Sequence, residues 1–242
     1  MILGFPSLLP IVALLFSTVQ SVVANTEKAI FVAPDPVNIP LSRPSLDDLN
    51  LHVLTPMAWS IRANLTRTFP AEAGDASTGA VTWLLLDHLT TSQRYEIRVC
   101  WTAIQPTAFT LEVYELDTVW DSPELIQSLA EYANSRLPTR SNGGQVPSPD
   151  GQKERKSSAL LLQVRASADY FTDHAVLMQE PPPVLADLIL DPYVYNTVPR
   201  SLLPTIGYLV LVSLVAWFVA RTIASKLQSI AITAETSTKK RD

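Results

Sequence analysis

Apolar and polar residues alternate along several short segments of the chain, which predicts β-strands. The clearest is RYEIRVCWTA (94–103), where one face carries Tyr95, Ile97, Val99 and Trp101. A period of two with one polar face is typical of an antiparallel sheet packed on one side. Similar runs predict strands at 29–33, 49–54 (Leu49, Leu51 and Val53 on one face), 80–89, 109–116 (Phe109, Leu111 and Val113 inward) and 159–166. The predicted fold class is mainly β, an antiparallel β-sandwich.

One short helix is predicted between the last two of these strands. Ser122-Pro123-Glu124 supplies an N-cap, a first-turn proline and an acid. Apolar residues then follow at helical spacing: Leu125, Ile126, Leu129 and Tyr132. The next segment, 137–157, has almost no apolar residues, and it is interpreted as a disordered loop in which Glu154 to Lys156 are solvated.

An uncharged apolar block opens the chain at residues 1–24. It ends in Val22-Val23-Ala24, and small residues at these positions are typical of a secretory signal peptide cleaved after Ala24. The alternative is an uncleaved N-terminal anchor.

A second uncharged apolar block, 201–220, lies between Arg200 and Arg221. Twenty residues of helix span about 30 Å, the thickness of a bilayer's hydrocarbon core. Tyr208 and Trp217 lie toward opposite ends of the block, where aromatic side chains favour the membrane interface. A single transmembrane helix is therefore predicted. The alternative, a buried core helix, would normally carry some polar residues.

Charge predicts the orientation of this span. Residues 221–242 carry five basic and two acidic side chains, whereas residues 25–200 carry 13 basic and 21 acidic ones. Because the positive flank stays in the cytoplasm, we expect a type I protein with a lumenal domain (25–200), one span and a cytoplasmic tail. A GPI-anchor signal is excluded, because the tail of 22 residues follows the apolar block.

Two short motifs fit this topology. Lys239 and Lys240 stand three and four residues from the C-terminus, which resembles a dilysine signal read by the coat-protein retrieval machinery of the endoplasmic reticulum. A stop-transfer flank explains them poorly, because they lie far beyond Ala220; a solvated basic tail is the other alternative. Asn64-Leu65-Thr66 is an N-glycosylation sequon, so Asn64 is a candidate glycan acceptor.

The segment 180–200 is expected to join the domain to the membrane. It begins with the stiff run Pro181–Pro183 and carries apolar residues close to the bilayer. It is interpreted as a final strand or amphipathic stretch, or as a docking surface for a membrane partner.

No catalytic set is evident. His52, His88 and His174 are scattered without metal-ligand spacing. Asp87 and His88 are neighbours on a predicted strand and should point to opposite faces. Asp47-Asp48 resembles the acidic pairs of enzymes that transfer lipid-linked sugars, but those enzymes have many spans. The chain is therefore expected to be a non-enzyme without a cofactor.

The cysteine count and the net charge exclude an internal disulfide and give no sign of a nucleic-acid partner. The single Cys100 excludes an internal disulfide; it is interpreted as a half-buried thiol, with an intermolecular disulfide as the alternative. A net charge of −5 gives no indication of a nucleic-acid surface.

The segment Arg94–Trp101, followed by Gln105-Pro106-Thr107 and Phe109, resembles the fungal accessory subunit of GPI mannosyltransferase II. That resemblance implies a glycosylated single-span protein of the endoplasmic reticulum. It also implies a partner, the multi-spanning catalytic subunit that adds the second mannose to the glycosylphosphatidylinositol precursor. Small residues of the span are expected to let a partner helix approach: Gly207, Ser213 and Ala216.

Three other classes of protein remain as alternatives. An accessory subunit of the translocon or of oligosaccharyltransferase has the same topology and fold. A cargo receptor of the early secretory pathway shares the dilysine tail, but it is expected to carry a coiled coil where 180–200 is proline-rich. A lumenal enzyme would need a catalytic cluster.

Overall fold

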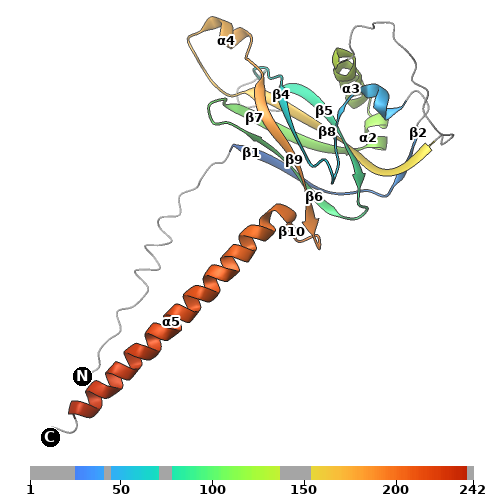
Figure 1. Ribbon diagram of the computed structural model, residues 1–242. Coiled ribbons are helices and arrows are strands. Elements are labelled where there is room, and N and C mark those ends of the chain that lie inside the picture. The colour runs from blue at the N-terminus through green and yellow to red at the C-terminus, as the bar shows by residue number, and fades with distance from the viewer. Residues whose placement is uncertain (1–24, 41–44, 71–77, 137–153, 239–242) are drawn as a thin grey trace.

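The described residues form a β-sandwich and one long helix that leaves it (Figure 1). The computed structural model describes residues 25–40, 45–70, 78–136 and 154–238. The predicted signal peptide, the residues 137–153 of the predicted loop, and Lys239 and Lys240 lie outside these ranges. Two five-stranded sheets confirm the mainly β class.

In the first sheet, β1 (Thr26–Val32), β6 (Arg94–Trp101) and β9 (Val184–Val194) lie side by side. Two shorter strands, β4 (Ser60–Leu65) and β10 (Val198–Pro199), also pair with β9. All of these pairings are antiparallel, as predicted.

The second sheet has the order β2 (Val37–Pro40), β8 (Glu154–Ala168), β5 (Ala80–Leu89) and β3 (His52–Leu54), and β7 (Thr107–Glu115) also pairs with β8. One pairing departs from the predicted antiparallel arrangement, because β3 runs parallel to β5.

The main core lies between the two sheets. Tyr95, Ile97 and Val99 are fully buried there, which confirms the alternation predicted for β6. Phe109 packs in the same core, with Leu111 and Val113 partly buried against it. The other sheet supplies facing leucines and valines from β5 and β8, so each sheet buries one apolar face against the other.

A second core covers the outer face of the second sheet. Helices α2 (Leu116–Asp121) and α3 (Pro123–Arg136) and the 3-10 helix η1 (Leu46–Leu49) pack there on Trp83 and neighbouring residues. The second sheet is thus buried on both faces, which explains the nearly continuous apolar run of β5. Helix α3 confirms the predicted helix, whereas α2 was not predicted.

The predicted strand 49–54 is wrong in its first half. Ser45 and Asp48 form a capping box that starts η1, and Asn50 ends this helix in the left-handed region, with φ of 50°. Only His52–Leu54 is extended, and Val53, on the predicted apolar face, is 43% exposed whereas Leu54 is fully buried.

The predicted loop also ends earlier than expected. Residues Glu154 to Lys156 begin β8 and pair with Ile39 and its neighbours in β2, so their backbone is a strand and not a loop. The side chains of Glu154 and Lys156 are exposed, as predicted, whereas that of Arg155 is partly buried. The sequence could not predict this pairing, because β2 lies more than a hundred residues earlier in the chain.

The segment 180–200 contains a central strand instead of a spacer. Of the interpretations considered, a final strand is the one observed, because β9 lies between β6 and β4 and buries Val184, Ala186, Leu188 and Leu190. A short helix, α4 (Ala175–Gln179), precedes this strand.

The chain leaves the sandwich through a 3-10 turn, η3 (Arg200–Leu202), and continues as α5 (Leu203–Thr238). Among the described residues, one helix is long and apolar enough to cross a membrane: Arg200–Ile230 reaches a mean hydropathy of 2.2, and none of its most apolar window is buried. The helix continues past the predicted end of the span at residue 220, because no Gly or Pro interrupts 221–238.

Candidate functional site

The outer face of the first sheet is the sheet face that no described α-helix covers. Helices α2 and α3 pack on the opposite side of the sandwich, whereas α5 leaves from the end of β10 (Figure 1). The antiparallel register places Lys28 beside Arg98 and Glu96 beside Asp191 on this outer face. The start of α5 lies on this same face, because Ser201 of η3 contacts Arg98 and Asp191 there.

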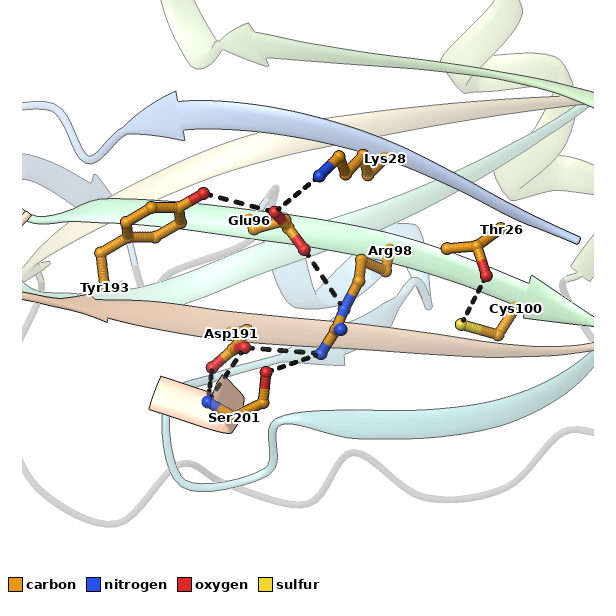
Figure 2. Close-up of polar contacts among 8 residues, drawn as sticks. All are labelled: Thr26, Lys28, Glu96, Arg98, Cys100, Asp191, Tyr193 and Ser201. Carbon is orange, nitrogen blue, oxygen red and sulfur yellow. Dashed lines mark hydrogen bonds and ion pairs between the residues drawn. The ribbon is translucent and has the colours of Figure 1, made fainter. Parts of the chain in front are cut away.

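Six residues on this face form what we call the junction network: Lys28, Glu96, Arg98, Asp191, Tyr193 and Ser201. Figure 2 shows that they connect three strands to the turn that starts α5. The Glu96 carboxylate lies 3.5 Å from Lys28 Nζ and 3.4 Å from Arg98 Nε, and it accepts a hydrogen bond of 3.3 Å from the Tyr193 hydroxyl.

Two carboxylates of the junction network are buried, since the side chains of Glu96 and Asp191 are 5% and 7% exposed. A buried charge is costly unless it is paired. Arg98 lies between the two, and its Nη2 is 3.4 Å from Asp191 Oδ2. Burial, followed by the Glu96 charge and hydrogen bond, raises the pKa of Tyr193, so this phenol keeps its proton.

The junction network also holds the start of α5. Arg98 Nη2 donates a hydrogen bond of 3.3 Å to Ser201 Oγ, and the Ser201 backbone N–H donates to both oxygens of Asp191 at 3.3 Å. Only residues 195–202 separate β9 from α5, and β10 and η3 occupy five of these eight residues. The helix therefore leaves the domain in a fixed direction and without a flexible linker.

A cavity of about 350 Å³ opens beside the junction network. Trp59, Ile189 and Pro192 give it apolar walls, and Arg98, Asp191 and Arg200 supply charge. Within the described residues, no group of three or more His, Cys, Asp or Glu side chains could hold a metal ion. The junction network is suited to hold its strands and η3 together, because its two carboxylates are already paired with Lys28 and Arg98.

A third buried carboxylate, Asp87, lies on the other sheet. Arg155 binds it with two hydrogen bonds of 3.1 and 2.6 Å, and Ser157 Oγ donates another of 2.6 Å. Burial alone would raise the pKa of Asp87, but these hydrogen bonds and one from the His88 backbone outweigh it and hold the pKa below its ordinary value.

The expectation that Asp87 and His88 point apart is wrong. A register shift between Leu86 and Leu89 and the left-handed φ of 53° at His88 break the alternation, and the His88 ring lies 3.9 Å from Asp87. This pair still forms no catalytic triad, because Ser157 bonds to the carboxylate and to the His88 backbone instead of the ring.

The other residues considered for chemistry have structural surroundings. Asp48 caps η1, and His52 and His174 lie on separate elements. Cys100 is half-buried, and the Thr26 hydroxyl lies 3.6 Å from its sulfur (Figure 2).

Asn64 is exposed on β4, where it pairs with Leu185 on the outer face of the first sheet. Five residues of extended chain, about 16 Å, separate it from Trp59 at the junction.

The small residues of the span are all exposed on α5. At 100° per residue, Ser213 and Ala216 lie within 60° of each other, whereas Gly207 lies half a turn from Ala216. Ser213 also lines a shallow apolar hollow with Ile206, Leu209, Val210 and Leu214. One partner helix can therefore contact Ser213 and Ala216 together, but not all three small residues.

Sequence reasoning missed the junction network. The alternation of β6 placed Arg98 on the polar face, but its partners Asp191 and Ser201 lie 93 and 103 residues later. The only available signal was the pair of acids, Asp187 and Asp191, in an otherwise apolar segment before the span.

Comparison with known protein families finds one that is similar to part of the chain. Residues 15–122 match the model of the family described as Pga1, GPI-mannosyltransferase II co-activator. This range includes β1 through α2 and the segment Arg94–Trp101 that carried the predicted resemblance. No curated protein and no solved structure matches the chain significantly. Over residues 15–122, less than half of the chain, the sequence is similar to the GPI-mannosyltransferase II co-activators, and the resemblance predicted from the sequence is confirmed.

Proposed function

We propose that the protein is a non-catalytic subunit of the endoplasmic reticulum membrane that stabilises the multi-spanning mannosyltransferase. That enzyme would add the second mannose to the glycosylphosphatidylinositol precursor. The observation that carries this proposal is the family match over residues 15–122. The apolar helix α5, fixed to the sandwich by the junction network, supports a role in which the subunit binds one partner through its span and its domain at once.

The outer face of the first sheet is the domain surface best suited to that partner. Ile30 and Val32 are 53% and 54% exposed on β1, where they pair with the charged residues Glu96 and Arg94 of β6. Apolar side chains surrounded by charge are typical of protein interfaces. The second sheet offers no equivalent face, because α2 and α3 pack on it.

Replacing both Ser213 and Ala216 with leucine should weaken assembly with the catalytic subunit. Small residues let helices approach closely in a bilayer, and a leucine side chain at the contact would hold the two backbones apart. We expect about a tenfold loss of co-purified partner, which corresponds to roughly 1.4 kcal/mol. The matched control is Gly207→Leu, since Gly207 lies on another face and a side chain there meets nothing within 4 Å. Equal losses from both variants would reject this interface.

One glycosylation experiment tests the orientation and the retrieval signal. If Asn64 is lumenal, the wild-type protein should carry a core glycan that endoglycosidase H removes, and Asn64→Gln should abolish the shift in mobility. If Lys239 and Lys240 return the protein to the endoplasmic reticulum, replacing both with serine should let that glycan be extended in the Golgi. An unglycosylated wild-type protein would argue against the orientation, and an unchanged glycan in the lysine variant would argue against retrieval.

A further inference from the structure

Exposed apolar side chains surround the start of α5. Met57 and Trp59, in the β3–β4 connection, are 92% and 52% exposed, and Tyr195, in the β9–β10 turn, is 92% exposed. Leu202 and Leu203 continue this surface onto the helix, at 45% and 44% exposure. Residues this apolar are seldom left in water together without a partner.

These side chains belong to elements fixed around the same turn. The Leu190 backbone N–H donates a hydrogen bond of 2.7 Å to the carbonyl of Trp59, and Trp59 and Arg200 line the same cavity. Tyr195 directly follows Val194, which pairs with Val198 two residues before η3. Figure 1 shows β10 and its turn at the end of the sandwich from which α5 leaves.

We propose that Met57, Trp59 and Tyr195, here called the interface patch, rest in the headgroup layer of the bilayer that α5 crosses. The proposal extends the proposed function and rests on α5 being a membrane span. Its occupant is a phospholipid surface, because the patch continues directly into the lipid-facing residues of α5 without a linker. Trp and Tyr favour this layer, since their rings are apolar and their N–H and O–H groups remain hydrated.

Charge at the same end of the domain suits phospholipid as well. Arg94 and Arg200 are exposed, and Arg94 also presents its backbone N–H to Asn196 in the β9–β10 turn. Guanidinium groups at this depth can bind lipid phosphates while Tyr195 enters the headgroup layer. The junction network then holds the sandwich against the membrane in one orientation relative to the bilayer. In that orientation, the outer face of the first sheet is accessible to a neighbouring membrane protein.

Depth measurement with nitroxide labels tests whether the interface patch contacts the headgroup layer. The full-length protein with Cys100→Ser would carry one label at a time, at Met57→Cys, Tyr195→Cys, Leu214→Cys or Phe171→Cys, in vesicles of phosphatidylcholine and phosphatidylinositol. Phe171 is the matched control, because it is 83% exposed but lies in the segment leading to α4, away from α5 (Figure 1). Leu214 reports on the span itself.

The expected result is graded. The ratio of collisions with oxygen to collisions with a water-soluble nickel chelate should be several-fold higher at Met57 and Tyr195 than at Phe171, and highest at Leu214. Water-like values at Met57 and Tyr195 with lipid-like values at Leu214 would contradict the contact of the interface patch with lipid, but they would still support α5 as a membrane span. Water-like values at Leu214 would contradict both the contact of the interface patch with lipid and the membrane-subunit proposal. Labels at the interface patch could also become protected from the nickel chelate only when the mannosyltransferase is added. That result would assign this surface to the protein partner and contradict its contact with lipid.

Discussion

Replacing Trp83 with alanine is expected to lower the free energy of unfolding by about 3–5 kcal/mol. Trp83 is fully buried beneath α2 and α3, and its Nε1 donates a hydrogen bond of 3.2 Å to Ser128 Oγ. Its ring also lies 6.0 Å from that of Tyr114. Removing the indole leaves a large cavity between the sheet and the helices, and it leaves the Ser128 hydroxyl without this partner. Pulse proteolysis of the full-length protein in urea and detergent measures the loss.

The matched control is Trp120→Ala on α2. Trp120 is 42% exposed, so its loss opens the surface and makes no closed cavity. A loss as large as that of Trp83→Ala would contradict the assignment of Trp83 to a closed second core.

Replacing Asp87 with alanine is expected to cost about 3 kcal/mol, because it leaves the Arg155 guanidinium without its carboxylate. The side chain of Arg155 is 23% exposed, so partial contact with water keeps the loss near the lower end for a buried ion pair. The same urea titration measures this loss. The control is Asp35→Ala, an exposed acid, for which we expect a change within about 0.5 kcal/mol.

The contribution of Asp87 should also depend on pH. Its pKa is held below the ordinary value of 3.8, so the stabilisation is fully present above that pH and is lost as the pH falls through the lower, folded-state pKa. The stability difference between the wild type and Asp87→Ala should therefore shrink in strong acid and stay constant near neutral pH. A difference that shrinks on raising the pH from 5 to 8 would contradict the pairing.

The strands with strong local patterns were predictable, and those that depend on distant partners were not. Strands β5, β6 and β7 followed from apolar runs or strict alternation, and α3 followed from its cap and spacing. Strands β2, β4 and β10 are short, and their residues become extended by pairing with β8 and β9. The apolar residues of β9 left a final strand and a membrane-proximal amphipathic stretch as alternatives, because a central strand and such a stretch have similar composition.

The site was less predictable than the fold. The alternation of β6 placed Glu96 and Arg98 on a polar face, but a polar face is normally taken to be solvated. Both carboxylates of the junction network are buried because β9 and η3 return beside β6, and this register cannot be inferred from one sequence. The sequence did indicate that Gly207, Ser213 and Ala216 are small enough for helix contacts. Helical geometry then shows that they do not share one face.

The most direct test of the central proposal is to purify the tagged full-length protein in mild detergent and identify by mass spectrometry what accompanies it. The account predicts a multi-spanning GPI mannosyltransferase in near-equal amount, and it predicts that depletion of this protein causes glycosylphosphatidylinositol intermediates with a single mannose to accumulate. Recovery of translocon, oligosaccharyltransferase or cargo-coat components in place of the mannosyltransferase, with unchanged intermediates on depletion, would contradict it.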